Sequence, residues 1–102
     1  MPKARFYTGF EDPDVMDHMM EVYHKSGWQY DEDWHSERIK ELVVASPSGR
    51  EWRIEDCLRE LDGKLMFGDL EQIEALRALN FFNVLYYFGF RDEKGVRELG
   101  LI

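Results

Sequence analysis

Apolar residues recur at helical spacing between residues 13 and 26, and this is the clearest pattern in the chain. At ~100° per residue, the apolar side chains of this segment fall within an arc of ~160°. They are Val15, Met16, Met19, Met20, Val22 and Tyr23. Asp12 can accept hydrogen bonds from the free amides of a helix start, Pro13 suits the first helical position, and Gly27 supplies a left-handed exit. The pattern predicts a helix over residues 13–26 with one face in the core and the other face acidic.

Two segments have the composition of β-strands. Residues 4–10 are rich in aromatic and β-branched types and precede a turn-forming Glu-Asp-Pro, so we expect a first strand there. Residues 38–54 carry apolar runs on both sides of a turn in which Pro47 presets the backbone and Gly49 can take a positive φ. This second pattern predicts a β-hairpin. Residues 28–37 fit no periodic template, and we predict a loop.

Three further helices are predicted in the C-terminal half. A short helix of about two turns is indicated by apolar residues at helical spacing, and these are Ile54, Cys57, Leu58 and Leu61. Asp69 and Gln72 have the spacing of a capping box, and they open the longest predicted helix, over residues 70–88. Residues 91–102 contain an N-cap candidate, Asp92, and two glycines, which favours a short and frayed helix.

The second half of the long helix, residues 81–88, is apolar almost all the way round. A helix of this kind is buried in the centre of a domain or presents a second face to a partner. The apolar run is far shorter than the ~20 residues that a bilayer requires, so no membrane contact is expected. A chain of 102 residues has room for one core. We therefore expect a single α+β domain over residues 1–102, in which a small antiparallel sheet, made of the N-terminal strand and the hairpin, packs against two main helices and one short helix.

The charge of the chain is concentrated in one segment. The formal net charge is −8, from 13 Lys and Arg and 21 Asp and Glu. Residues 11–37 hold nine acids and a single base, Lys25, so the rest of the chain is formally neutral. A negative net charge repels the phosphate backbones of nucleic acids, so direct nucleic-acid binding is not expected. A single cysteine and a polar start without an apolar leader make the cytoplasm the expected compartment.

Two sets of polar side chains have spacings that could bind a metal ion. The first set would lie together on the exposed face of the first helix and consists of Asp14, His18 and Glu21. The second set would share one face of an extended segment and consists of Asp31, Asp33, His35 and Glu37. Sets of this kind are common on solvated surfaces, so no metal and no cofactor is expected. A small metal-dependent enzyme that uses His18 or His35 remains an alternative.

The chain carries no catalytic signature. Cys57 lies on an apolar stripe and is predicted to pack in the core. The serines lack the context of a nucleophile elbow, and no glycine-rich phosphate loop or dinucleotide fingerprint occurs. We therefore expect that this protein is not an enzyme.

Large aromatic residues lie close to the densest run of acids. Trp28, Tyr30 and Trp34 surround the sequence of residues 31–33, Asp-Glu-Asp. Aromatic anchors flanked by charge are typical of tight protein interfaces. Trp28 and Trp34 are equally well interpreted as core residues, and the choice between the two stays open. Concentrated negative charge costs self-repulsion, which a basic partner would relieve.

These features predict a small acidic interaction protein that docks on a basic, nucleic-acid-binding surface of a partner protein and occupies it as a nucleic-acid mimic. The residues expected to bind the partner are Asp14, Asp17, Glu21, Trp28, Tyr30, Asp31, Glu32, Asp33 and Trp34. Phage-encoded inhibitors of host defence, including anti-CRISPR proteins, act in this way, and the analogy rests on size and charge alone.

One alternative is a structural, homo-oligomeric subunit whose interface uses the aromatic end of the long helix. The residues of this interface would be Phe81, Phe82, Tyr86, Tyr87 and Phe88. A homodimer that also binds a basic partner is compatible with both hypotheses.

Overall fold

The computed structural model describes residues 12–33, 38–62, 69–90 and 92–102. Within these ranges the chain forms a small α+β fold, as expected. The elements, in order, are α1 (Pro13–Lys25), β1 (Gln29–Tyr30), a 3₁₀ turn η1 (Ile39–Glu41), β2 (Val44–Ala45), β3 (Glu51–Trp52), α2 (Ile54–Leu61), α3 (Leu70–Tyr87) and α4 (Glu93–Glu98).

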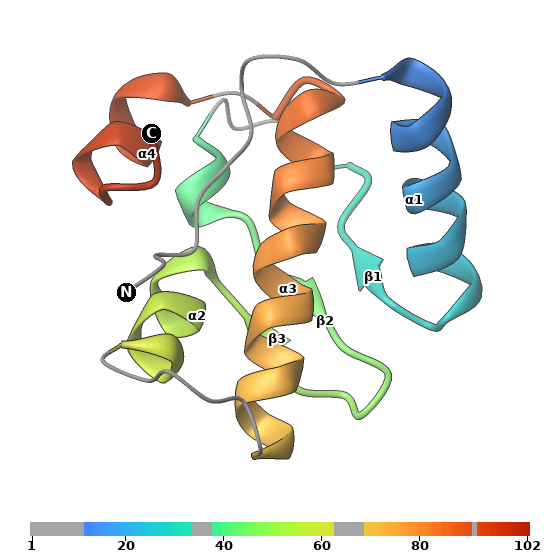
Figure 1. Ribbon diagram of the computed structural model, residues 1–102, viewed down its shortest axis with the longest axis horizontal. Coiled ribbons are helices and arrows are strands. Elements are labelled where there is room, and N and C mark those ends of the chain that lie inside the picture. The colour runs from blue at the N-terminus through green and yellow to red at the C-terminus, as the bar shows by residue number, and fades with distance from the viewer. Residues whose placement is uncertain (1–11, 34–37, 63–68, 91) are drawn as a thin grey trace.

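Helix α3 runs through the middle of the molecule, with α1 on one side, α2 on the other and the strands behind it (Figure 1). The Asp69 carboxylate caps its start by accepting from the amide of Glu71 at 2.8 Å, and Gly89 ends it with a φ of 113°. Phe81, Phe82 and Leu85 have no exposed surface. The apolar second half of the helix is therefore buried at the centre of the domain, which was the first of its two predicted roles.

Helix α1 begins and ends where its capping residues predict. Asp12 accepts a hydrogen bond of 2.9 Å from the amide of Asp14, and Gly27 has a φ of 92° just after the helix. The prediction that its whole apolar face is in the core is wrong in part. Tyr23 is buried, whereas Val15 and Val22 are 51% and 40% exposed. The apolar arc is wider than the strip along which one helix packs on another, and α1 packs on α3 alone among the helices with substantial contact.

The sheet, as far as the structure describes it, has three short antiparallel strands in the order β1-β2-β3. Strands β2 and β3 form the predicted hairpin, in which the amide of Ser46 donates to the carbonyl of Arg50 at 2.9 Å. Gly49 has a φ of 90° in this turn, as expected. The strands are shorter than predicted because Ile39–Glu41 form a 3₁₀ turn and Ile54 already belongs to α2.

Strand β1 was not predicted, because residues 28–37 were interpreted as a loop. Residues 29 and 30 instead pair with Ala45 and Val44 of β2. The pairing connects segments far apart in sequence, and a two-residue strand carries no periodicity of its own. The predicted strand over residues 4–10 lies outside the described residues, so its place in the sheet stays a prediction.

The remaining helices close the core. Helix α2 buries Ile54, Cys57 and Leu61, as its spacing predicts. Helix α4 is capped by Asp92, which accepts a hydrogen bond of 3.1 Å from the amide of Gly95. Among the described residues, no helix is long and apolar enough to cross a membrane.

Candidate acidic surface and the hollow beside it

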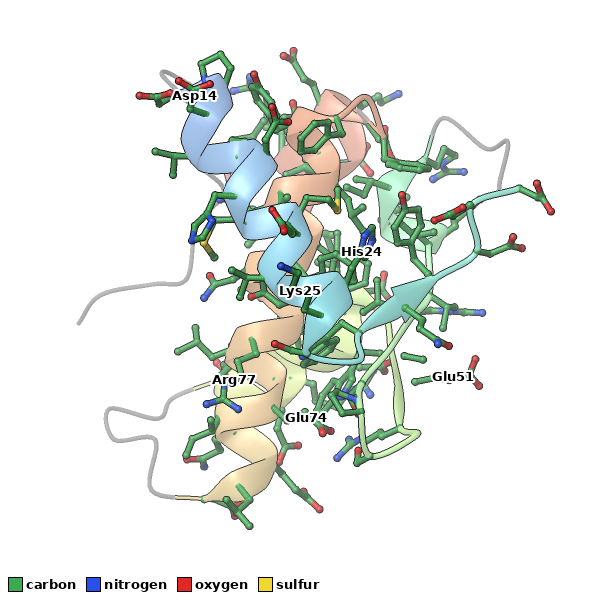
Figure 2. The ribbon with its side chains drawn as sticks, turned by 90° about the vertical axis from the view of Figure 1, so that its right-hand side faces the viewer. Asp14, His24, Lys25, Glu51, Glu74 and Arg77 are labelled. Carbon is green, nitrogen blue, oxygen red and sulfur yellow. The ribbon has the colours of Figure 1, made fainter. Side chains whose placement is uncertain are left out.

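The acids of α1 lie along one exposed side of the helix. Asp14, Asp17 and Glu21 are separated by three and four residues, the spacing of neighbours on a helix surface, and all three are exposed. His24 follows three residues after Glu21 and is also exposed. The row of exposed polar side chains on α1 therefore runs from Asp14 at one end of the helix to His24 near the other end, where His24 points toward β1 (Figure 2).

The second acidic segment directly follows β1. Asp31, Glu32 and Asp33 are all exposed. The carboxylate of Asp31 accepts a hydrogen bond of 2.9 Å from the amide of Asp33, so the loop turns through an Asx-type contact. This contact gives the segment a defined local shape without neutralising its charge.

A shallow hollow lies between the end of α1 and the segment that follows β1. It has a volume of about 360 Å³. Its lining residues are His24, Trp28, Gln29, Tyr30 and Glu32. His24 and Glu32 thus meet across one concavity, although the first belongs to α1 and the second follows β1. We call Asp14, Asp17, Glu21, Asp31, Glu32 and Asp33 the acidic surface; of these residues, Glu32 lines the hollow.

Most charges of the acidic surface are not compensated from within the described chain. Glu21 forms an ion pair of 2.6 Å with Lys25, and both side chains are exposed. Among the described residues, the other five acids make no ion pair with a lysine or arginine. Elsewhere the same protein does pair its acids, for example Glu98 with Lys40 at 3.5 Å. The acidic surface is therefore an excess of negative charge and not a network of salt bridges.

Tyr30 forms a fixed wall of the hollow. Its ring meets the rings of Phe81 and Phe90 edge to face, with centroid distances of 5.9 and 5.6 Å. The ring of His24 lies nearly parallel to it, with a centroid distance of 6.0 Å and an interplanar angle of 23°. Burial, and then the negative charge of Glu32, raise the pKa of the Tyr30 phenol. The phenol is therefore neutral at physiological pH.

Trp28, predicted to bind a partner or to pack in the core, is a core residue. It is 5% exposed and meets the rings of Tyr23 and Phe81 edge to face. It lines the hollow with little exposed surface, and it is therefore not an exposed anchor for a partner. Trp28 is buried because β1, which follows it directly, pairs with β2, and this pairing places the indole against Tyr23 of α1. Trp34 lies outside the described residues, and its role stays a prediction.

The metal-binding hypothesis gains no support from the geometry. Within the described ranges, no group of three or more His, Cys, Asp or Glu side chains is placed to hold a metal ion. Asp14, His18 and Glu21 are therefore neighbours on a helix surface and not a ligand set. The second candidate set includes His35 and Glu37, which lie outside the described residues.

Most residues of the predicted oligomer interface at the end of α3 are buried in the core. Phe81 and Phe82 have no exposed surface, and Tyr86 is 3% exposed. Tyr87 is half-buried, and Phe88 is 41% exposed. An interface made of the five aromatic residues together is thus not available on the folded chain, because α3 is surrounded by the other elements.

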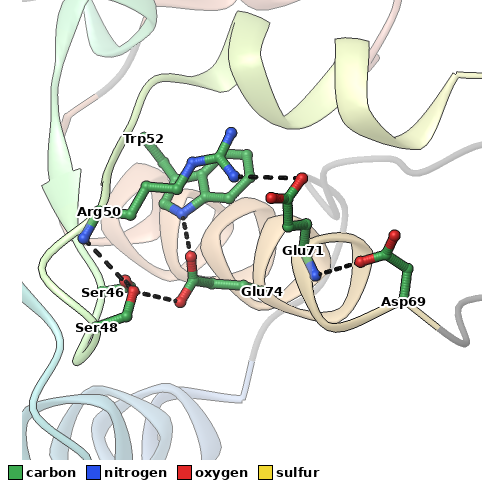
Figure 3. A network of polar contacts seen from close by, with 7 residues as sticks. All are labelled: Ser46, Ser48, Arg50, Trp52, Asp69, Glu71 and Glu74. Atoms are coloured by element: carbon green, nitrogen blue, oxygen red, sulfur yellow. Dashed lines mark hydrogen bonds and ion pairs between the residues drawn. The ribbon is translucent and has the colours of Figure 1, made fainter.

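A polar cluster that the sequence did not indicate joins the hairpin to α3 (Figure 3). The Glu74 carboxylate accepts hydrogen bonds from Ser48 Oγ at 2.8 Å and from Trp52 Nε1 at 2.9 Å. The Arg50 guanidinium lies 3.8 Å from the centroid of the Trp52 ring and 3.7 Å from a carboxylate oxygen of Glu71. The residues come together only through the fold.

The cluster holds the hairpin against α3. Burial would raise the pKa of Glu74, but hydrogen bonds from Ser48, Trp52 and Ser46, with the charge of Arg50, lower it below its ordinary value. A carboxylate with a lowered pKa is a weak general base. Cys57, the other nucleophile considered above, has no exposed surface, and burial raises the pKa of its thiol to about 12. It packs in the core, as predicted.

Comparison with protein-family models, with curated protein sequences and with solved structures finds no match to this chain. Its function is therefore inferred from the geometry described above.

Proposed function

We propose that this protein is a binding module whose acidic surface docks on a basic, nucleic-acid-binding surface of a partner protein. It acts there by binding and not by catalysis, and it inhibits the partner by occupying the place of a nucleic acid. The observation that carries the proposal is the uncompensated negative charge of the acidic surface, to which two separate segments of the chain contribute. Five of its six carboxylates have no basic partner within the described residues.

The arrangement of these charges supports the proposal because it carries a free-energy cost. Like charges that lie close together repel, and folding brings the loop after β1 beside the end of α1. A protein with twelve basic residues outside this region could have paired them with these acids. Among the described residues, the basic side chains that pair with acids outside the acidic surface are Arg38, Lys40, Arg50 and Arg59, as in the ion pair between Arg38 and Glu41 at 3.3 Å. The negative charge that remains without ion pairs on the acidic surface therefore supports binding to a cationic partner.

Carboxylates in such a row can replace the phosphates of a nucleic acid. A basic groove responds chiefly to negative charge and its spacing, since contacts to the phosphate backbone supply most of the sequence-independent affinity. Complementary charge also steers the encounter and sets the register of a protein interface. Docking of the acidic surface in such a groove would exclude the nucleic acid directly.

The test compares two variants with the same change in net charge. The first carries Asp14→Asn, Asp17→Asn and Glu21→Gln on α1. The matched control removes three exposed carboxylates elsewhere on the molecule, with Glu51→Gln, Glu55→Gln and Glu93→Gln. Each protein, checked for folding by circular dichroism, is immobilised and exposed to cell lysate, and captured proteins are identified by mass spectrometry.

The proposal expects that the wild type and the control capture the same nucleic-acid-binding protein. The α1 variant should capture it at least about tenfold less, because three closely spaced charges are lost from the contact. High salt, and also an added duplex DNA or RNA oligonucleotide, should release the captured protein. Capture that is equal for both variants and insensitive to salt and oligonucleotide would show that the acidic surface is merely solvated.

A further inference from the structure

The hollow beside the acidic surface combines two kinds of group that recognise the same side chain. Tyr30 supplies an aromatic ring, and Glu32 supplies an exposed carboxylate two residues later. His24 and Gln29 add polar atoms at the rim, and the lining contains no lysine or arginine. Because no lysine or arginine of the described residues lines the hollow, its carboxylate is available to a cation that a partner supplies.

The protein already shows how such groups hold an arginine. At the hairpin, the Arg50 guanidinium lies 3.8 Å from the centroid of the Trp52 ring, while Glu71 lies 3.7 Å from one of its terminal nitrogens. An aromatic face and a carboxylate therefore act together on one guanidinium within this fold (Figure 3). The hollow offers the corresponding pair, Tyr30 and Glu32, without an arginine from the described residues to fill it.

We propose that the hollow lined by His24, Tyr30 and Glu32 binds an arginine side chain of the basic partner. This inference rests on the proposed function, and it names the residue type that anchors the partner. The guanidinium packs against the Tyr30 ring, while its N–H groups donate to the carboxylate of Glu32. The charges of Asp31 and Asp33 draw the cation toward the hollow.

Arginine fits this hollow better than other ligands do. A guanidinium is planar and weakly hydrated, stacks on aromatic rings and donates two parallel hydrogen bonds to a carboxylate, whereas an ammonium is a strongly hydrated point charge. Phosphates and other anions are repelled by the three carboxylates of residues 31–33. The Tyr30 ring is also packed edge to face against the rings of Phe81 and Phe90, which restricts its rotamers. Little side-chain freedom is then lost on binding.

The experiment measures the binding of two short peptides to the ¹⁵N-labelled full chain at low ionic strength. One peptide alternates three arginines with glycine, and the other has three lysines in the same places. Peptide affinity and backbone amide shifts are followed by NMR for the wild type and for Glu32→Gln and Tyr30→Leu, since leucine retains apolar packing without the aromatic face. Matched controls are Glu51→Gln, an exposed acid of β3, and Tyr87→Leu, a half-buried tyrosine that does not line the hollow.

The inference expects the arginine peptide to bind roughly two- to fivefold tighter than the lysine peptide, the range of an exposed cation–π contact. Amides of Gln29, Tyr30 and Glu32 should shift more than the amide of Asp14. The preference should fall toward unity in Glu32→Gln and in Tyr30→Leu, and it should persist in both controls.

Three other results are possible, and they separate a failure of the arginine site from a failure of the docking surface. Equal affinity for the two peptides, or an arginine preference that survives Glu32→Gln and Tyr30→Leu, overturns the arginine site. If the triple α1 variant then weakens both peptides, the proposed acidic docking surface still stands. Failure of both peptides to bind the wild type at low salt counts against the docking surface as well as the hollow.

Discussion

The indole nitrogen of Trp52 donates a hydrogen bond of 2.9 Å to the carboxylate of Glu74, and this contact ties the hairpin to the central helix. Trp52 has no exposed surface, and the same carboxylate also accepts from Ser48. A buried indole N–H without an acceptor would cost free energy, so Glu74 allows the largest side chain of the hairpin to enter the core. The sheet keeps its place behind α3 partly through this contact, and with it β1 and the hollow.

Glu74→Gln is expected to lower the free energy of unfolding by about 1 kcal/mol at pH 7, because two hydrogen bonds lose their charged acceptor. The folded state lowers the pKa of Glu74 below its ordinary value of 4.5. The stabilisation is therefore present above that value and is lost as the pH falls through the folded pKa. Urea unfolding at pH 7 and in steps below pH 4.5 should show the wild type approaching the variant. Glu71→Gln, which removes only an exposed ion pair, should change stability by less than about 0.5 kcal/mol.

Gly95→Ala should destabilise the protein, although alanine normally favours a helix over glycine by up to about 1 kcal/mol. A Cβ at this position would lie 2.8 Å from Cγ of Asp92 and 3.0 Å from Cδ of Lys40. The clash displaces the carboxylate that caps α4, at a cost of about 1–2 kcal/mol. Thermal unfolding of Gly95→Ala in the wild-type and Asp92→Ala backgrounds is the measurement. An equal penalty in both backgrounds would show that Asp92 is not the obstacle.

Tyr23→Phe should cost about 1 kcal/mol at neutral pH, since the Tyr23 hydroxyl donates to the carbonyl of Arg77 at 2.8 Å. Burial raises the pKa of this phenol from 10.0 to about 12. A raised folded pKa means that the contribution is complete below pH 10 and disappears as the pH approaches 12. Denaturant unfolding between pH 8 and 12 should therefore show the difference between wild type and variant shrinking above pH 10. A constant difference would contradict the assignment.

Cys57 should resist thiol reagents in the native state. It has no exposed surface, and burial raises its pKa to about 12, so the reactive thiolate is rare. Reaction with a chromogenic disulfide at pH 8 should be more than about tenfold slower than in a urea-unfolded sample. Fast labelling of the folded protein would place Cys57 outside the core and revive a nucleophilic role.

Added salt should stabilise this protein if repulsion among the carboxylates of the acidic surface lowers the free energy of unfolding. Raising the ionic strength from about 10 mM to about 150 mM shortens the screening length and weakens repulsion among the uncompensated carboxylates. The unfolding midpoint of the wild type should rise, and the rise should be smaller in Asp17→Asn/Glu32→Gln. The matched pair Glu51→Gln/Glu55→Gln should respond to salt as the wild type does. Identical salt responses of the wild type and the two double variants would mean that repulsion within the acidic surface does not lower the stability of the fold.

The elements that depend on neighbouring residues were predictable. Asp12 and Gly27 bracket α1, and Asp69 and Gly89 bracket α3, because caps and left-handed exits act within a few residues of the chain. The hairpin turn at Gly49 follows from the same local chemistry. The acidity of residues 11–37 is equally a property of the chain itself.

The contacts between distant segments came only from tertiary packing. Periodicity placed both Val15 and Tyr23 on the apolar face of α1, but the position of α3 decided that Tyr23 is buried and Val15 is exposed. Pairing of β1 with β2 put Trp28 in the core and brought Glu32 to the hollow beside His24. The cluster around Glu74 joins residues 22 and 26 positions apart. Local hydrogen bonding and side-chain periodicity determine which residues are helical or turn, whereas the choice among several possible buried faces depends on the other elements competing for the same core.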